Sequence, residues 1–372
     1  MIMRYLRILI FVLFLTAVSY IYRFTLKKST MRYLYLTGNE IKVLSGKLIS
    51  SQENGNGLLK TTTEGMKTQA SSSHLNPVNV LRDNGIIFVE VTDRMKPLSL
   101  ALCAIESAAR VYKDRPVAYF MKGLNGTNSE TVKMKYFPTL MPHNNVYFFP
   151  LKMEEVLAET PLLSWYQKID PSREKFWIHV SSDAMRLALI WKYGGIWMDS
   201  DIISRQQIPH QNFLAAESNQ RSSNGVFGFP SHHDFIWRSM EDFTSKYNSE
   251  IWGYQGPWLF TRILNTFCSI PPFKSVEDVM CGNITFLNPQ RFYPVFYTDW
   301  QRYFEVWTKE PTFNDSYALH LWNHFNNGPV LNPALGLFLL ILTGAFCAFL
   351  NPVSELYIHY LCICLLSDFH IL

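Results

Sequence analysis

The stretch that decides the fold covers residues 191–201 and reads WKYGGIWMDSD. Gly194 and Gly195 can end a preceding helix, because glycine accepts backbone conformations with positive φ. The apolar run that follows predicts a buried strand. Side chains two positions apart on an extended chain point to the same face. Asp199 and Asp201 are therefore expected to project together from the end of that strand.

Two carboxylates placed in this way suit a divalent cation. Their hard oxygen atoms are ligands that Mg²⁺ and Mn²⁺ prefer, and such a cation can in turn hold a diphosphate. The alternative is a solvated turn after a strand, since a bare Asp-x-Asp pattern is short. The rest of the chain has to decide between the two.

The segments around this stretch alternate between strand and helix. Strands are predicted at 85–91, 116–121 and 145–149, and helices at 98–112 and 176–193. Strand, helix and strand at this spacing is typical of a parallel α/β sheet. The segment 123–142 reads as a surface loop.

The predicted helix at 176–193 carries Asp183 and Arg186 on a face away from its apolar stripe. Residues three apart on a helix are neighbours, so one interpretation is a surface ion pair of about 0.2–0.5 kcal/mol. The other is a pair of ligand-binding groups one helix upstream of the two acids.

Composition sets broad limits. The chain has 372 residues, a net charge of +4 and 48% hydrophobic residues, enough for one large core or two small ones. The charge excess is too mild to indicate a nucleic-acid partner.

The N-terminal region predicts a membrane tether. Residues 1–7 are short and basic and read as a cytosolic tail, and 8–22 form an uncharged, largely apolar run. We interpret 8–22 as an uncleaved signal anchor rather than a cleaved signal peptide. Residues 23–83, with a tract rich in Ser, Thr, Gly, Asn and Gln, are expected to form a flexible stem.

Two cysteines and three sequons give information on the cellular compartment in which the protein folds. Cys268 and Cys281 lie on either side of a Pro-Pro loop, and they form either a disulfide pair or two buried thiols. Asn125, Asn283 and Asn314 each begin an N-glycosylation sequon, which supports secretion.

The end of the chain has a different character. Residues 328–372 are strongly apolar, with seventeen uncharged residues from 334 to 350. This tail reads either as a second membrane segment or as an alternative transcript end.

Taken together, several ordered blocks resemble glycosyltransferase family 32. The central ones are 181–186 (SSDAMR) and 193–201 (YGGIWMDSD), which match the family form S-D-x-x-R…G-G-x-Y-x-D-x-D. Further matching blocks are FMKGL at 120–124, SSNG at 222–225, WGYQGP at 252–257, PQRFYP at 289–294 and YALHLWNH at 317–324. The resemblance covers about residues 84–327.

The resemblance implies an architecture and a location. It implies an α/β GT-A fold, a single Rossmann-like mixed sheet flanked by helices, over residues 84–327. It also implies a single-pass type II Golgi membrane protein whose N-terminal anchor leaves the catalytic domain in the lumen.

The resemblance also implies the site residues. Asp199 and Asp201 would be the catalytic pair and, with His320, would hold Mn²⁺. The donor-binding residues would be Asp183, Arg186, Trp197, Asn224, Gln255 and Gly256. Trp197 stands where the family usually has Tyr, and its ring is expected to stack. The residues themselves identify no second carboxylate as a nucleophile.

The activity implied is transfer of GlcNAc from UDP-GlcNAc, with retention, in α-1,4 linkage to the terminal β-galactose of mucin-type O-glycans. One alternative is an α-1,4-galactosyltransferase acting on glycolipids. Another is an inactive, membrane-tethered, lectin-like relative. The intact acidic pair and the Asp183 and Arg186 pair favour an enzyme.

Overall fold

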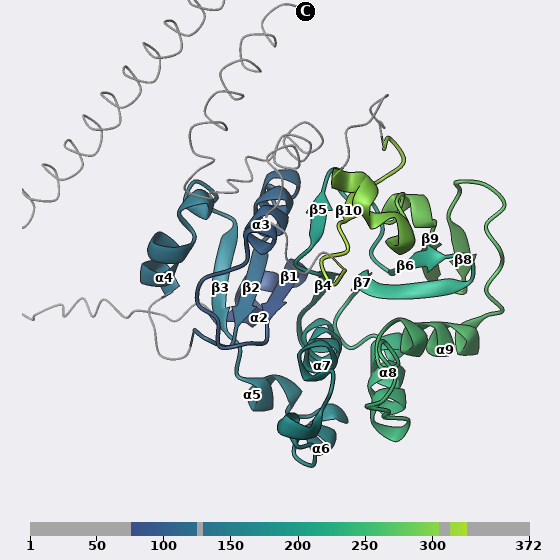
Figure 1. Ribbon diagram of the computed structural model, residues 1–372, viewed down its shortest axis with the longest axis horizontal. Coiled ribbons are helices and arrows are strands. Elements are labelled where there is room, and N and C mark those ends of the chain that lie inside the picture. Colours follow the sequence, from purple (N-terminus) through teal and green to yellow (C-terminus); the bar gives the residue numbers. More distant parts are fainter. Residues whose placement is uncertain (1–75, 125–128, 305–312, 326–372) are drawn as a thin grey trace, which may run out of the picture. The chain divides into compact units, whose positions relative to one another are not determined.

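The computed structural model describes residues 76–124, 129–304 and 313–325, and these residues form one α/β unit (Figure 1). Its centre is a mixed eight-stranded sheet in the order β3-β2-β1-β4-β7-β6-β9-β8. The strands are β1 (Asp83–Glu90), β2 (Val117–Met121), β3 (Val146–Pro150), β4 (Gly194–Met198), β6 (Phe213–Ser218), β7 (Arg221–Phe229), β8 (Val279–Cys281) and β9 (Ile284–Leu287). Strands β3, β2, β1 and β4 are parallel, whereas β7 is antiparallel to both β4 and β6.

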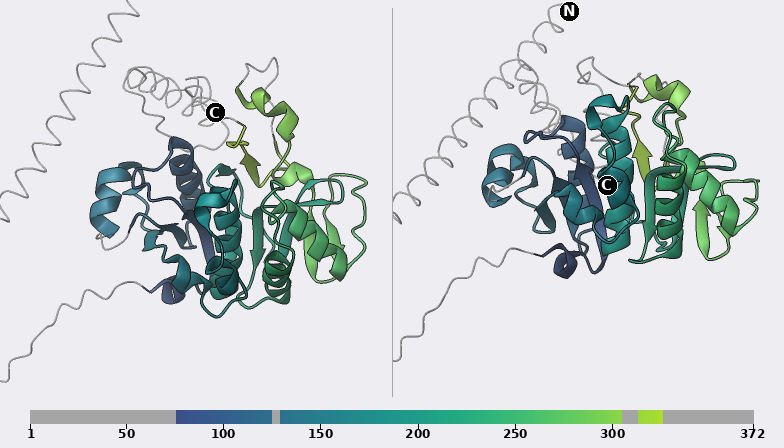
Figure 2. Two further views of the ribbon diagram at one scale, coloured as in Figure 1. Left: turned by 60° about the horizontal axis from the view of Figure 1, so that its bottom comes forward. Right: turned by 90° about the horizontal axis from the view of Figure 1, so that it is seen from below.

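Helices cover both faces of this sheet, as the views in Figure 2 show. The helices are α2 (Pro77–Leu81), α3 (Ser99–Val111), α4 (Ser129–Tyr136), α5 (Met153–Leu157), α6 (Leu162–Tyr166), α7 (Trp177–Tyr193), α8 (Asp234–Ser245) and α9 (Pro257–Phe267). A second, two-stranded sheet pairs β5 (Ile202–Ser204) with β10 (Ala318–His320) on the α3 side. The 3₁₀ segments are η1 (Pro138–Leu140), η2 (Pro171–Arg173), η3 (Pro289–Arg291) and η4 (Tyr297–Phe304).

Two hydrophobic cores lie on opposite faces of the sheet. Along β1, Ile86 and Phe88 face the core under α3, and Ile87 between them faces the core under α7. All three side chains are fully buried, because alternate side chains leave opposite faces of a strand and helices cover both faces here. The predicted mixed sheet flanked by helices is confirmed.

The Gly-Gly turn joins α7 to β4. Helix α7 ends at Tyr193, and the N–H of Gly194 donates to the carbonyl of Ile190. Gly194 and Gly195 have φ values of 60° and 100°, a region that favours glycine. A Cβ on Gly195 would collide with the backbone of Gly85, so the glycine lets β4 pack closely beside β1.

Two expectations about the chain's organisation are wrong. The stem assigned to 23–83 includes residues that are folded: α2 begins behind an Asn76 cap, and Leu81 is fully buried. The folded unit therefore starts before residue 84. The expected loop at 123–142 contains α4 and η1, and Phe137 is fully buried.

The predicted membrane segments cannot be compared with the structure. The tail at 1–7, the anchor at 8–22 and the segment at 328–372 lie outside the described residues. Within the described part, no helix has both the length and the apolar character needed to span a membrane.

Candidate active site

The two acids and the late histidine meet at one end of the sheet. Asp199 follows β4 directly, and Asp201 precedes β5. Strand β10 pairs with β5 so that His320 lies opposite Ile202. The His320 Nε2 atom is 3.4 Å from an Asp201 carboxylate oxygen, and one ligand atom from each of the three residues lies within 4.8 Å of the others.

This group fits a divalent cation by the chemistry of its donors. Two carboxylates and one imidazole form a donor set that suits a divalent metal ion. Burial, followed by the nearby Asp201 carboxylate, raises the pKa of Asp199, while Arg186 opposes that shift. A cation bound between Asp199 and Asp201 would stabilise the buried charge of Asp199 and remove the repulsion between the two carboxylates. The structure therefore favours a metal-binding group over a solvated turn.

Asp199 is oriented by three contacts. Its N–H donates to the carbonyl of Gly225 at 2.9 Å. Its carboxylate accepts from Trp197 Nε1 at 2.9 Å and lies 3.1 Å from the Arg186 guanidinium. Trp197 is only 1% exposed and its ring lies under that guanidinium, so it acts through Asp199 instead of offering a free ring face for stacking.

A second buried cluster lies beside the metal-binding group. Arg186 donates to the Asn224 carbonyl at 2.6 Å and pairs with Asp183 at 3.2 Å. The Asn224 side chain donates to the Asp183 carboxylate at 2.7 Å. All three residues are buried, which excludes the surface ion pair. Burial raises the pKa of Asp183 to about 6, although Arg186 and Asn224 both stabilise the charged form.

Gly256 and Gln255 contribute in different ways. A Cβ on Gly256 would lie 2.8 Å from Asn224 Nδ2, so the glycine leaves room for the contact between Asn224 and Asp183. The Gln255 amide is buried, donates to the carbonyls of Phe243 and Lys246, and does not line the cleft. Direct binding of the donor by Gln255 stays a prediction.

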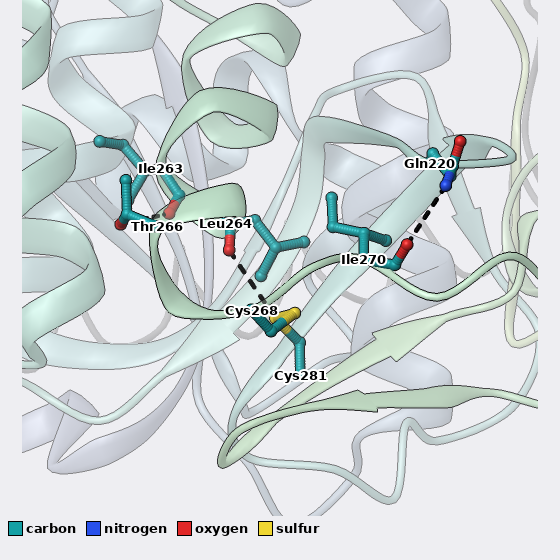
Figure 3. The surroundings of a disulfide bond; sticks show 7 residues. All are labelled: Gln220, Ile263, Leu264, Thr266, Cys268, Ile270 and Cys281. Carbon is teal, nitrogen blue, oxygen red and sulfur yellow. Dashed lines mark hydrogen bonds between the residues drawn. A yellow bond between two sulfur atoms is a disulfide. The ribbon is translucent and has the colours of Figure 1, made fainter.

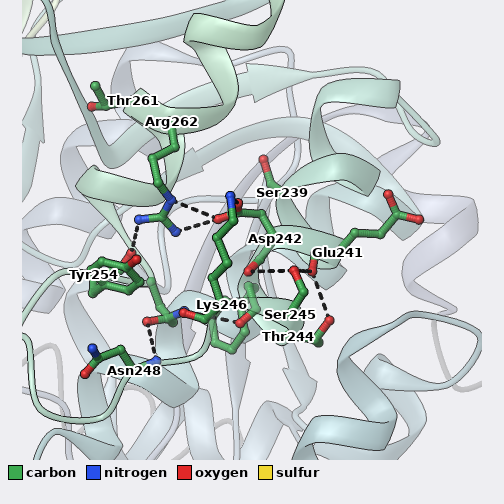
Figure 4. A network of polar contacts seen from close by, with 12 residues as sticks. Ser239, Glu241, Asp242, Thr244, Ser245, Lys246, Asn248, Tyr254, Thr261 and Arg262 are labelled. Carbon is green, nitrogen blue, oxygen red and sulfur yellow. Dashed lines mark hydrogen bonds and ion pairs between the residues drawn. The ribbon is translucent and has the colours of Figure 1, made fainter.

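Figure 4 shows a polar network that joins α8, α9 and the segment between them. Asp242 accepts from Arg262 and from Lys246, and Arg262 also donates to the Tyr254 carbonyl at 3.2 Å. Asp242 is buried, so these ion pairs hold α8, α9 and their connection together. Gln255 belongs to this network, with its side-chain amide oxygen Oε1 accepting from the backbone N–H of Asn248.

The two clusters line one cleft of about 750 Å³. That volume lies in the range of small-molecule sites. The cleft also has walls that sequence reasoning missed. These residues include Glu217 and Arg221 from the β6–β7 hairpin, and Trp252, Tyr297 and His324. Trp252 and His324 lie in blocks that match the family, but the resemblance gave them no role. Glu217, Arg221 and Tyr297 are single residues without a local pattern, so nothing in their spacing marks them.

The disulfide candidate and the two sequons within the described residues do not line the cleft. Cys268, just after α9, and Cys281, at the end of β8, are joined by a disulfide with their Cα atoms 5.4 Å apart (Figure 3). Asn283 and Asn314 are exposed. Asn125 lies outside the described residues.

Comparisons with known proteins point in the same direction. A family described as "Alpha 1,4-glycosyltransferase conserved region" matches residues 228–350, and one described as "Glycosyltransferase sugar-binding region containing DXD motif" matches residues 99–220. The chain is 54% identical over 244 residues to human alpha-1,4-N-acetylglucosaminyltransferase, covering 65% of this chain and 72% of that protein. It is 34% identical over 277 residues to human lactosylceramide 4-alpha-galactosyltransferase, covering 73% and 78%.

Among solved structures, the chain is similar to a galactosyltransferase LgtC complex with donor and acceptor sugar analogues, at a TM-score of 0.36 and 14% identity. That match covers 66% of this chain and 88% of the other.

The acidic pair, the buried Asp–Arg–Asn cluster and the matched families define a glycosyltransferase of the DXD class. Within that class, the chain belongs to the α-1,4-glycosyltransferases, the glycosyltransferase family 32 that its motifs resemble.

Proposed function

We propose that this protein transfers GlcNAc from UDP-GlcNAc, with retention of configuration, to the terminal β-galactose of mucin-type O-glycans, forming an α-1,4 linkage. The observation that carries this proposal is the 54% identity to human alpha-1,4-N-acetylglucosaminyltransferase. The acidic pair and the buried cluster beside it supply groups that suit a nucleotide-sugar donor.

Each cluster has a distinct task in this proposal. Asp199, Asp201 and His320 would hold Mn²⁺, which when bound supplies positive charge to the departing diphosphate. Arg186, held by Asp183 and the Asn224 carbonyl, presents the donor with a guanidinium of fixed orientation. The mixed sheet, with Asp199 and Asp201 directly after β4, supports a GT-A arrangement of the donor site.

The cellular setting is part of the proposal. A disulfide between Cys268 and Cys281 is expected in an oxidising compartment, and two exposed sequons are accessible to glycosylation there. With residues 8–22 as a signal anchor, the protein would be a type II Golgi membrane protein with a lumenal catalytic domain.

The direct test uses the full chain from a secretory host, purified in detergent. With Mn²⁺ and a β-galactoside acceptor, we expect transfer from UDP-GlcNAc and little from UDP-Gal, and NMR of the product should show an α-1,4 linkage. Replacing Mn²⁺ by EDTA should abolish transfer. Folded protein that transfers neither sugar would contradict the proposal.

A second function has its own support. The 34% identity to human lactosylceramide 4-alpha-galactosyltransferase favours galactosyl transfer to a glycolipid as the alternative. Preference for UDP-Gal and lactosylceramide in the same assay would select it. Glycan binding with no transfer from either donor would instead select the lectin-like reading.

A further inference from the structure

Glu217 is a buried carboxylate that the donor and metal clusters do not use. It lies on β6, lines the cleft, and its side chain is only 9% exposed. Among the described residues, no group donates a hydrogen bond to it. Its ion-pair partner is Arg221 Nε at 3.8 Å, beyond hydrogen-bond distance.

Arg221 is incompletely satisfied as well. Its Nε atom is buried and has no hydrogen-bond partner among the described residues. A buried polar group that lacks its hydrogen bond costs about 1–3 kcal/mol, and more when it is charged. Arg221 Nε is such a group, and the Glu217 carboxylate beside it in the wall of the cleft accepts no hydrogen bond from a described residue. The pair therefore indicates a site whose hydrogen bonds a ligand can complete.

Other carboxylates of the cleft do not share this property. Asp183 accepts from Asn224, Asp199 from Trp197 and Asp201 from the N–H of Asn323. Glu90 accepts from Thr92. Burial raises the pKa of Glu217, which is consistent with a carboxylate that the protein solvates poorly.

The charges of Glu217 and Arg221 indicate which kind of ligand would fit between them. Glu217 is not part of the group of ligand atoms around Asp199, Asp201 and His320, so a shared cation does not explain it. A carboxylate beside a guanidinium offers hydrogen-bond acceptors and donors with no net charge, which fits the hydroxyls of a neutral sugar. The Arg221 guanidinium also lies 4.8 Å from the ring of Trp258, which is 47% exposed.

We propose that Glu217 and Arg221 form the subsite for the acceptor sugar, with the Glu217 carboxylate accepting hydrogen bonds from hydroxyls of the terminal hexopyranose and the Arg221 guanidinium donating to its oxygens. The inference rests on the proposed function, because it takes the second substrate to be a neutral glycan. It concerns binding and orientation of the acceptor, and no covalent step on Glu217 is involved.

The test replaces Glu217 by Gln, which keeps the shape and removes the charge. We expect the KM for a β-galactoside acceptor to rise at least tenfold, while UDP binding with Mn²⁺ and acceptor-independent hydrolysis of the UDP-sugar stay within twofold of wild type. Glu154→Gln, an exposed change on α5, is the matched control and should leave all three quantities unchanged. Equal losses of donor hydrolysis and transfer would overturn the acceptor role.

Acceptor binding can be measured without transfer, by saturation-transfer difference NMR of methyl β-galactoside in the presence of UDP and Mn²⁺. The signal should be clear for wild type and weak for Glu217→Gln. A deoxygalactoside that lacks the hydroxyl bound by Glu217 should bind wild type more weakly than the parent galactoside does. The Glu217→Gln variant should bind the two sugars equally.

The outcomes separate the two proposals. Wild type that binds the galactoside but transfers neither sugar would contradict the proposed function and leave this subsite standing. Equal signals from wild type and variant, no binding by either, or a sugar covalently attached to Glu217 in a trapped wild-type enzyme would overturn the subsite.

Discussion

Trp197 shows how one buried residue can orient a candidate metal ligand, Asp199. Its indole N–H donates to the carboxylate of Asp199, and its ring lies 5.0 Å from the Arg186 guanidinium. The ring itself is buried. Groups that orient a metal ligand change metal affinity and activity when they are removed.

Trp197→Phe should therefore weaken the metal site with a smaller effect on folding. We expect the Mn²⁺ concentration for half-maximal transfer to rise about 10–100-fold. Trp237→Phe is the matched control, since it removes an indole that donates to Glu241 on α8, outside the cleft. Unchanged Mn²⁺ dependence in Trp197→Phe, measured by titration, would show that the indole contact is dispensable.

The buried Asp183 makes a prediction about pH. Its pKa is raised from 3.8 to about 6 in the folded protein, so its contribution to stability is fully present below the unfolded pKa and is lost as the pH rises through about 6. Between pH 7 and pH 5, the free energy of unfolding should therefore increase by about 1 kcal/mol more in wild type than in Asp183→Asn. Urea unfolding in EDTA at both pH values measures the difference, and equal changes in the two proteins would argue against the raised pKa.

Among the elements, the disulfide ties the end of α9 to the strand β8 at a separation of 13 residues. Replacing Cys268 and Cys281 together by Ser should lower the free energy of unfolding by roughly 3 kcal/mol, because the unfolded chain is no longer constrained. The kcat should stay near that of wild type, since neither cysteine lines the cleft.

Thermal unfolding with and without dithiothreitol provides the control for this pair. Reductant should lower the Tm of wild type towards that of the double variant and leave the variant unchanged. A large loss of kcat in a variant that remains folded would instead indicate a coupling between β8 and the cleft.

Long, periodic elements could be predicted from the sequence to within about two residues. Helices α3 and α7 agree in this way because their apolar stripes recur at the helical period. The short strands β1 to β4 were also predicted, but the short helices α2 and α4 were missed. Helix α4 has few apolar residues, and α2 is a single turn whose stability comes from burying Leu81 and from the Asn76 cap. Those contacts with the rest of the fold are absent from a local pattern.

At the scale of the whole molecule, the cleft combines parts of the chain that are distant in sequence. Some of its residues could be predicted from local spacing and others could not. Asp183, Arg186, Asp199 and Asp201 belong to one continuous helix, turn and strand, so their spacing made them candidates, and the resemblance gave them their roles. His320 came only from the resemblance, because its place beside Asp201 depends on the pairing of β10 with β5. The role proposed for Glu217 rests on the absence of a hydrogen-bond donor to its carboxylate among the described residues. Only the folded structure shows that absence.

His320→Ala should remove the one candidate metal ligand that β10 contributes and so weaken metal binding. The Mn²⁺ concentration that supports half-maximal UDP binding should rise at least about tenfold, because outer-shell partners of metal ligands alone account for 10–100-fold effects. His210→Ala, outside the cleft, should have no effect. Calorimetric titration of UDP at several Mn²⁺ concentrations provides the measurement, and identical curves would exclude His320 as a ligand.

The position of β8 has a consequence for solubility in a crowded compartment. β8 ends the order of strands in the main sheet, and an end strand exposes backbone groups that can pair with another chain and start aggregation. Asn283 is exposed in the turn that joins β8 to β9. A bulky, hydrated glycan attached to Asn283 would cover this edge of the sheet. The sequon would then reduce self-association of the protein in the secretory pathway.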